Sequence, residues 1–572
     1  MEIAKYKLIQ NRTMKKFLVV LLLLLVTVSL QLSAQTRSGT VDIFMGADFN
    51  YRDIYFNNRV YDVLLNLTPG IKWNMGYRWE VAAQVFVPVV NQYGDRYKKV
   101  RLNMAVLSKQ LVVGQHWKMK LSGGLFGSER YGLDLRNMFV FNPWLAMTAQ
   151  VGLTGYCSMA TGWEASTMKR LTAQVGPEFY LHRWNTQISI RGGRYVYGDY
   201  GMIGEGFRHF KHVSVGVYVS YSNKGKEDAG FKVIMMLPPY KRAVRKINIR
   251  PASNFRLTYS VEGNGYANCT YFTDPEQNER EGWFDRDLLP WGKDTMTPDF
   301  TFKRRKEEKK MKNEERIMKN FRQMLLLVFL WAGCLSASAQ LYTGLSGLIN
   351  TPSADMNEEG TARIGSYFMN KHFTPDDDGR YGFIYDGEKY NTVDFYLSLT
   401  PFRWVEIGYT FTLQKSLLEG YEKPKYNQKD RYFSVKLNPL REGRYYPAIA
   451  IGSNDFLGSP SKRHGHGGSG AGYFCNYYIV ATKHFKPLGH DIGVNLAYRY
   501  CPTTYSEKWE GVVGGITWQP KWVPDLRVIA EYTGNEVNIG VDCLLWKHLF
   551  LQGGLQNGKY FSGGICFQMN LF

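Results

Sequence analysis

Apolar and polar residues alternate along much of the chain. The clearest stretch, residues 213–221, reads VSVGVYVSY and has an apolar side chain at every second position. Alternation with a period of two predicts a β-strand with one apolar face. Turn sequences such as Ser122-Gly-Gly separate the alternating segments, and no convincing amphipathic helix is present. Similar segments lie near 40–49, 60–67, 78–90, 99–112, 117–126, 144–156, 170–181, 185–194, 229–237 and 254–262.

The second half of the chain repeats this pattern. Apolar positions in 393–399 and 405–411 flank a short turn, which predicts a hairpin, and two more strands are predicted at 492–500 and 526–532. In a soluble sandwich the less apolar face of these strands would meet bulk water. In a membrane barrel it would line a wet lumen, and the apolar face would meet lipid. The charged residues on this face are Asp394, Glu406, Arg499, Arg527 and Glu531.

Two segments have the features of a secretory signal peptide. Each has a basic start, an apolar run and small residues before a cleavage position, the first ending at Ala34 and the second at Ala339. The second apolar run has about 16 residues, fewer than the about 20 of a spanning helix. A membrane helix there, or a lipid attached at Cys334, is an alternative. We therefore predict a signal peptide at 1–34, a first β-barrel at 35–263, a polar charged tail and linker at 264–317, an internal signal-like segment at 318–339 and a second β-barrel at 340–572.

Composition narrows the class of protein. Only 44% of the residues are hydrophobic, and apart from the two signal-like runs no stretch is apolar enough to be a spanning helix, which excludes a polytopic helical protein. An aromatic content of 15% and 57 glycines suit barrel strands with aromatic girdles. The net charge of +21 suggests an anionic partner. For an exported chain this favours acidic lipid or acidic polysaccharide over nucleic acid, although the charges could simply solvate loops and lumen.

The pattern as a whole predicts an all-β fold of two antiparallel transmembrane β-barrels in tandem, with roughly 10–14 strands each. The last segment, GGICFQMNLF, alternates and ends on Phe572, as outer-membrane strands often do. A soluble β-sandwich is the alternative. The seven cysteines form no CxxC motif, so their spacing supports no metal cluster and leaves any disulfide pairing open.

Several short motifs go beyond periodicity. They are GLSGLINTPSADMNEEGTARIG at 344–365, PAIAIGSNDFLG at 447–458, RYVYGDYGMIGEGFRHF at 194–210 and VIMMLPP at 233–239. These motifs resemble the YjbH-type exopolysaccharide-biosynthesis family of outer-membrane proteins. The resemblance implies two barrels, here in reversed order, that pair with each other and work with periplasmic polysaccharide-assembly factors. It implies no known catalytic residue.

Four charged residues in one of these motifs are candidate glycan contacts: Arg194, Asp199, Glu205 and Arg208. Arginine–carboxylate contacts suit an acidic sugar, whereas the structural alternative is a salt-bridge ladder between neighbouring strands. Asp199 and Glu205 would serve as a glycosidase pair only if they were suitably spaced. Pro352, Asp355 and Gly360 are interpreted as a turn that enters the second barrel.

No catalytic motif, metal site or cofactor site is predicted. His464 and His466 lie in a basic Gly-rich loop without a third ligand. We therefore expect a non-enzymatic outer-membrane protein in which a polar, basic lumen or rim guides an anionic glycan during exopolysaccharide or capsule export or assembly. The alternatives are a barrel enzyme that acts on glycan or lipid, and a general porin.

Overall fold

The structure is a computed structural model that describes thirteen ranges of the chain. The predicted signal peptide 1–34, the internal signal-like segment 318–339, His464 and His466 lie outside the described residues, as does most of the predicted linker 264–317. The described ranges are 39–53, 61–113, 116–142, 144–160, 162–223, 227–238, 245–260, 270–276, 341–375, 388–417, 422–456, 472–502 and 505–572.

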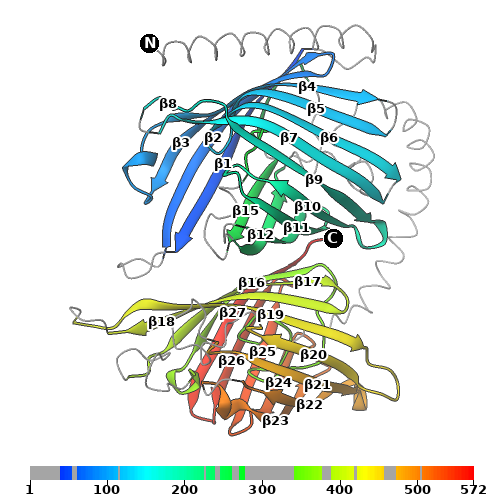
Figure 1. The fold of residues 1–572 in the computed structure, drawn as a ribbon. Coiled ribbons are helices and arrows are strands. Elements are labelled where there is room, and N and C mark those ends of the chain that lie inside the picture. The colour runs from blue at the N-terminus through cyan, green and yellow to red at the C-terminus, as the bar shows by residue number, and fades with distance from the viewer. Residues whose placement is uncertain are drawn as a thin grey trace, which may run out of the picture. The chain divides into compact units, whose positions relative to one another are not determined.

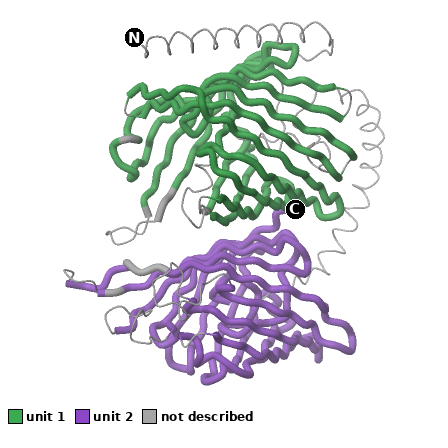
Figure 2. Tube along the Cα trace, viewed as in Figure 1, with its two compact units in different colours: residues 1–52, 62–310 green, residues 53–61, 311–572 purple. Residues whose placement is uncertain are grey.

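The chain divides into two compact units, which Figure 2 colours separately. Strands β1 to β15 build the first unit and β16 to β27 build the second (Figure 1). Regular helix in the described ranges consists of single 3₁₀ turns. Across those ranges, no helix has both the length and the apolar character needed to cross a membrane. The 3₁₀ turns are η1 (Asp95–Tyr97), η2 (His182–Trp184), η6 (Lys371–Phe373), η8 (Pro487–Gly489) and η9 (Glu507–Trp509).

The first unit is one large sheet in which strands that follow each other in sequence pair antiparallel. The strands are β1 (Thr40–Asp53), β2 (Tyr61–Gly76), β3 (Trp79–Asn91), β4 (Arg101–Val113), β5 (Trp117–Phe126), β6 (Arg130–Asn142), β7 (Leu145–Ser158), β8 (Glu164–Ala165), β9 (Arg170–Leu181), β10 (Thr186–Arg194), β11 (Tyr200–His209), β12 (Val213–Ser222), β13 (Asp228–Met236), β14 (Ile247–Pro251) and β15 (Asn254–Ser260). Strand β8 pairs only with β7, outside the main path.

This sheet does not close on itself. Its path ends at β14 and β15, which only Ala252 and Ser253 separate in sequence. Strand β14 pairs parallel with β1, whereas β15 pairs antiparallel with β13. The chain therefore passes from one edge of the sheet to the other at residues 252–253, and no hydrogen-bonded ladder among the described strands joins β14 to β15. The prediction of two tandem barrels is consequently not confirmed for this unit.

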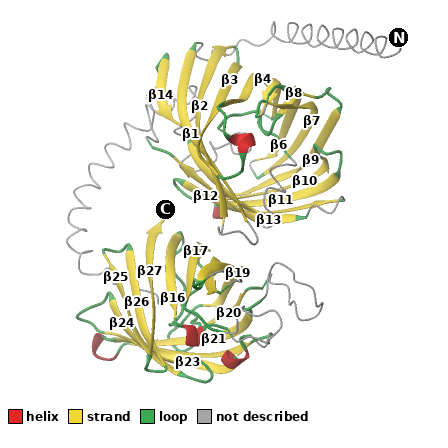
Figure 3. Ribbon diagram, turned by 90° about the vertical axis from the view of Figure 1, so that its left-hand side faces the viewer, coloured by secondary structure: helices red, strands yellow, loops and turns green. Residues whose placement is uncertain are grey.

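The second unit is a closed barrel of twelve strands, and Figure 3 shows these strands in yellow from another side. Strand β27 pairs antiparallel with β16, for example at Gly365 and Cys566, and this pairing closes the wall. Here the predicted barrel is confirmed, and the strand number lies within the predicted range. The strands are β16 (Thr361–Met369), β17 (Thr392–Phe402), β18 (Val405–Ser416), β19 (Lys425–Leu440), β20 (Ala448–Asn454), β21 (Asn476–Phe485), β22 (Asp491–Tyr500), β23 (Gly511–Gln519), β24 (Leu526–Tyr532), β25 (Val537–Leu545), β26 (Leu549–Gln556) and β27 (Tyr560–Asn570).

Both units bury polar side chains and expose apolar ones. On β12, Val219 is 63% exposed while Tyr218 is 1% exposed, and on β22, Leu496 is 62% exposed while Arg499 is 4% exposed. The five charged residues named for the second half are all buried. A soluble sandwich would bury the opposite face, because burial of apolar surface drives its folding. The observed distribution is that of a wall with an apolar exterior and a polar interior.

Candidate functional site

The four predicted glycan-contact residues do not form one cluster. In the antiparallel pair of β10 and β11, Arg194 lies opposite Tyr200 at one end and Arg208 lies opposite Thr186 at the other. Glu205 lies between these ends. The prediction of a single charged cluster is therefore wrong, because an extended motif distributes its side chains along the length of a strand.

Glu205 is the centre of a buried ion-pair triad. Its carboxylate accepts hydrogen bonds from Arg191 Nη2 and from Lys232 Nζ, each at 2.7 Å. These three residues belong to β10, β11 and β13, and the Glu205 and Lys232 side chains are almost fully buried. A buried carboxylate between two cations is stable only while both partners are present. This arrangement links β10, β11 and β13 and leaves Glu205 little capacity for a ligand.

The other three predicted residues have separate surroundings. Asp199 is buried, and its Oδ2 accepts a hydrogen bond from Ser222 Oγ at 2.5 Å. The Arg194 guanidinium lies over the ring of Tyr200, with 5.9 Å between the guanidinium carbon and the ring centroid. The Arg208 guanidinium lies in the same way over Phe210, at 5.6 Å. Asp199 and Glu205 thus have different partners, and their placement supports no paired-carboxylate chemistry.

The polar face of the first unit holds a short segment of the chain itself, residues 270–276. Tyr271 donates from its hydroxyl to Asp134 on β6 at 2.6 Å, and Gln84 on β3 donates to the Pro275 carbonyl at 3.0 Å. Lys72 on β2 donates to Asp274 at 2.7 Å. The part of the predicted tail that the structure describes is therefore packed against the sheet.

Charge fixes the far end of this segment. Arg250 on β14 contacts both carboxylate oxygens of Glu276, at 2.7 and 2.9 Å, and Ser253 donates its backbone N–H to the same group. Burial raises the pKa of the Glu276 carboxyl, but Arg250 and Lys72 outweigh it and hold that pKa below its usual range. Burial likewise raises the pKa of Asp274, and Lys72 more than offsets this. Both groups therefore carry a negative charge at neutral pH.

The closed barrel of the second unit holds a longer interior segment, residues 341–357. Its backbone N–H groups at Ile349, Asn350 and Thr351 all donate to the Glu531 carboxylate on β24, at 2.9 to 3.1 Å. Arg499 on β22 donates to the Asn350 carbonyl at 2.5 Å. A carboxylate that accepts several backbone N–H bonds is a strong, charge-assisted anchor.

A second anchor in this barrel is the buried pair of Glu406 on β18 and Lys436 on β19, whose charged atoms lie 3.2 Å apart. Glu406 accepts from the backbone N–H of Ser346 at 2.9 Å and from that of Asn357 at 2.7 Å. Lys436 donates to the carbonyls of Ser346 and Asp355. Two charges that would be costly to bury alone are thus satisfied by the backbone of the segment.

These contacts place the interior segment inside the lumen. Side chains that bond it come from β17, β18, β19, β21, β22, β24 and β26, which lie all round the closed wall. Only a segment in the interior can reach so many strands. Its chain reverses within the barrel, where Leu348 donates to the Thr351 carbonyl and Gly347 forms a bridge with Pro352.

Of the predicted entry turn at Pro352, Asp355 and Gly360, only Gly360 lies in the turn that leads into β16, where Thr361 donates to the Glu358 carbonyl at 3.0 Å. The reversal lies at residues 348–351 within the lumen, and Pro352 follows it. Gly360 does adopt a left-handed conformation, with φ of 86°, just before β16. The sequence signal for a turn was present, but the segment has no periodicity that would reveal its burial among lumen side chains.

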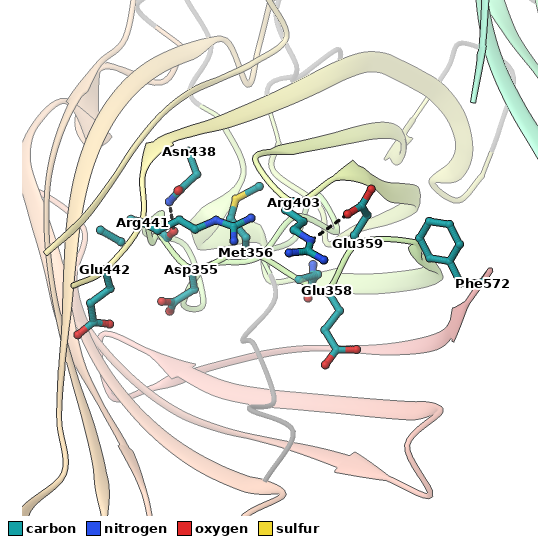
Figure 4. A pocket seen from close by; sticks show the side chains of 12 residues that line it. Asp355, Met356, Glu358, Glu359, Arg403, Asn438, Arg441, Glu442 and Phe572 are labelled. Atoms are coloured by element: carbon teal, nitrogen blue, oxygen red, sulfur yellow. Dashed lines mark hydrogen bonds and ion pairs between the residues drawn. The ribbon is translucent and has the colours of Figure 1, made fainter. Parts of the chain in front are cut away.

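A pocket of about 570 Å³ lies where the interior segment leaves the barrel (Figure 4). Asp355 of the segment lies on the side of Arg441 and Glu442, which follow β19, whereas Glu358 and Glu359, just after the segment, lie on the side of Arg403. Arg403, in the turn after β17, also lines the pocket and forms an ion pair with Glu359 at 3.1 Å. Carboxylates outnumber guanidinium groups in this lining, so it offers acceptors to hydroxyl-rich ligands and little net attraction to an anion.

Two comparisons with known proteins point to the same family as the motifs do. Residues 339–500 match the family described as YjbH, exopolysaccharide biosynthesis protein YbjH. The chain is 25% identical over 222 residues to the uncharacterized lipoprotein YjbH of Escherichia coli K12, an alignment that covers 33% of this chain and 27% of that relative. The predicted YjbH-type resemblance is therefore confirmed, and the family match lies mainly in the closed barrel and its interior segment.

Similarity to solved structures is weak. The siderophore receptor PirA from Pseudomonas aeruginosa aligns with 94% of this chain and 82% of its own, at 7% identity and a TM-score of 0.13. The translocation pore of the P pilus usher PapC aligns with 92% of this chain and 99% of its own, at 7% identity and a TM-score of 0.16. At these TM-scores neither likeness says anything about the fold or the function.

Sequence reasoning placed Glu406, Arg499 and Glu531 on the polar face but missed their role as anchors, and it missed Lys436, Tyr271 and Glu276 altogether. Lys436 and Glu406 are single charges within alternating strands, and only their place in the alternation of apolar and polar residues marks them as inward facing. Tyr271 and Glu276 lie in a polar stretch without periodicity. Such contacts join residues far apart in sequence, so no local pattern reports them.

Proposed function

We propose that this chain is an outer-membrane protein that takes part in the export or assembly of an exopolysaccharide and performs no catalysis. In this proposal the apolar faces of both units meet lipid, and inward polar side chains guide an anionic glycan by weak, repeated contacts. Periplasmic polysaccharide-assembly factors would be its partners, and the two units would pair in the membrane.

The observation that carries the proposal is the reversed burial of apolar and polar side chains. Exposed Val219 and Leu496 lie on the same strands as buried polar groups, which suits a strand between lipid and a polar interior. The family match at residues 339–500 supports the link to exopolysaccharide. The net charge of +21 favours an anionic polymer over a neutral one.

A general porin receives less support. In the second unit, the interior segment occupies the lumen, and buried residues such as Leu348 and Ile349 fill space that a water channel would need. For a barrel enzyme, the described residues offer a contact between a serine hydroxyl and a histidine, Ser214 Oγ with His209 Nδ1 at 2.8 Å. The other ring nitrogen of His209 contacts the Gln187 amide oxygen, and the histidine is buried, so this pair gives a substrate little access. We therefore favour a guiding role over the two alternatives.

Deletion and complementation in the source bacterium test the proposal. Loss of the gene should reduce surface polysaccharide, the wild-type chain should restore it, and a chain with Arg194→Glu and Arg208→Glu should restore it only partly while reaching the outer membrane in normal amount. Arg183→Glu, at an exposed arginine in η2, is the matched control and should complement fully. Unchanged surface polysaccharide after deletion would contradict the proposed function.

A further inference from the structure

Three arginines gather at one end of the first unit. Arg130 begins β6, Arg170 begins β9 and Arg194 ends β10. The register brings these ends together, since Arg130 lies opposite Tyr156 on β7, Arg170 lies opposite Thr154 on the same strand and Arg194 lies opposite Ala173 on β9. We call Arg130, Arg170 and Arg194 the arginine trio.

The trio converges on the loop that joins β10 to β11. Arg170 Nη1 and Arg194 Nη2 each lie 3.5 Å from the position that a Cβ on Gly198 would take, so both guanidinium groups face the same point. The Arg130 guanidinium lies over the neighbouring Tyr197 ring, 5.8 Å from its centroid. Gly198 has φ of 77°, a left-handed conformation that favours glycine and allows this close approach.

Carboxylates neutralise the trio only in part, since Glu129 attracts the Arg130 charge without forming an ion pair with it. Among the ion pairs formed by the described residues, none includes Arg130, Arg170 or Arg194. Asp199 accepts from Ser222, and Glu129 accepts from Tyr156 and Ser158. Nε of Arg194 is buried without a hydrogen-bond partner among the described residues, and Arg130 is only 9% exposed.

Like charges in such a place cost free energy unless an anion joins them. Arg170 lies near enough to Arg130 for their charges to repel, and the burial of Arg130 weakens the screening by water. Guanidinium groups bind carboxylate and phosphate oxygens in paired hydrogen bonds. The trio therefore has the charge and the donors of an anion site.

The position of the trio favours a glycan over a lipid head group. Arg130 shares its strand face with Asp134, and Arg170 shares its face with Thr172, and both of these neighbours contact Tyr271 on the polar side of the sheet. The polar side is turned away from the exposed apolar residues that would meet lipid. The partly exposed ring of Tyr197 adds apolar surface beside the charges.

We propose that Arg130, Arg170 and Arg194 form a binding site for the acidic groups of a polysaccharide, namely uronate carboxylates or phosphate substituents. The inference rests on the proposed function and names the chemical class of its glycan.

Binding of oligogalacturonate to the purified full-length chain in neutral detergent tests the site. The double variant Arg130→Gln and Arg170→Gln should bind at least tenfold more weakly, which corresponds to about 1.4 kcal/mol. Wild-type affinity should fall as sodium chloride rises, because salt screens the contacts. Arg183→Gln, in an exposed arginine at the opposite end of the same unit, should bind like the wild type.

Three outcomes would overturn the site: unchanged affinity in the double variant, an equal loss in Arg183→Gln, or equal binding of a neutral maltooligosaccharide. A parallel titration with detergent micelles that contain a phosphate-bearing lipid distinguishes the sources of the anion. If the double variant loses affinity for those micelles and keeps it for oligogalacturonate, the glycan assignment is wrong. None of these results depends on surface polysaccharide in cells, so the proposed function is judged separately by the deletion experiment.

Discussion

At the scale of single residues, the protein places charge where most soluble proteins place apolar side chains. Glu205, Lys232 and Lys436 are almost completely buried, and each has a charged partner within 3.2 Å. Such groups do not add much net stability when paired, but removal of one partner leaves a buried charge unsatisfied. This triad and this pair therefore specify which strands lie near each other more than they strengthen the fold.

The first prediction concerns the triad. Glu205→Gln should lower the free energy of unfolding by about 3–5 kcal/mol, because Lys232 and Arg191 lose their shared counter-charge in a buried place. Urea unfolding of the folded chain in detergent, followed by heat-modifiable gel mobility, measures the change. Glu227→Gln, in an exposed residue before β13, should be nearly neutral. Equal stability of the two variants would contradict the role given to the triad.

Sequence alone identified which face of a strand each charge occupies, but not its partners. The positions of Arg499 and Glu531 in the alternating pattern of their strands correctly predicted that both face away from the apolar side. Their bonds to Asn350 and its neighbours could not be predicted, because those residues lie some 150 to 180 positions away in sequence. Likewise, the trio escaped notice because Arg130 and Arg170 lie in other strands than the motif that contains Arg194.

At the scale of elements, each unit has an interior segment without regular secondary structure. Residues 270–276 follow the last strand of the first unit, and residues 341–357 precede the first strand of the second. Both are held by side chains from several strands, so they cross-link walls that otherwise pair only with immediate neighbours. In the second unit this also accounts for the burial of Glu406, Lys436 and Glu531, since backbone groups of the segment satisfy their charges.

The second prediction tests the lumen anchor. Glu531→Gln should loosen residues 341–357, because an amide cannot accept three backbone N–H bonds as a carboxylate does. Leu348→Cys serves as the reporter, and its labelling by maleimide is followed by mass spectrometry. Labelling should be at least tenfold faster when Glu531→Gln is also present, because the free energy needed to open the segment falls by about 1.4 kcal/mol. Glu507→Gln, at an exposed residue, is the control and should leave labelling slow. Fast labelling of the reporter without any second substitution would show that the segment is not enclosed.

The third prediction concerns pH. The pKa values of Asp274 and Glu276 lie below their usual range in the folded chain. The two carboxylates therefore stabilise the fold fully at any pH above the ordinary carboxyl pKa of about 4. This stabilisation is lost as the pH falls through their lower pKa values in the folded chain. Hydrogen exchange of residues 270–276, corrected for intrinsic rates, should show protection that declines as pH falls below that point. Lys72→Met should weaken protection already at neutral pH, and a protection that does not change with pH would contradict the ion-pair anchor.

Elements were predicted well where periodicity was strict. The segment 213–221 is β12, and the segment 492–500 lies in β22. Tight turns were harder to place, because several use residues without a turn signature, such as Tyr77 and Arg78, both with positive φ. A hairpin turn of this type usually contains asparagine or glycine, so these positions give no local warning.

At the scale of the whole molecule, two units share one principle of burial but differ in closure. The second is a closed barrel, whereas the first changes strand partner between β14 and β15. Alternation predicted both walls because it reports only the two faces of each strand. Closure depends on which strand edges pair with each other. Alternation of apolar and polar residues does not predict such pairing, and so it did not indicate that β14 pairs parallel with β1.

The central claim is that the exposed apolar faces meet lipid, and β12 offers a matched pair of tyrosines to test it. Tyr221 is 55% exposed on the apolar face, and Tyr218 is 1% exposed on the polar face. A photoreactive benzophenone amino acid replaces each tyrosine in turn, and mass spectrometry after illumination in lipid vesicles identifies the products. We predict acyl-chain adducts at position 221 and none at position 218. Absence of lipid adducts at position 221, with the chain folded, would contradict the account.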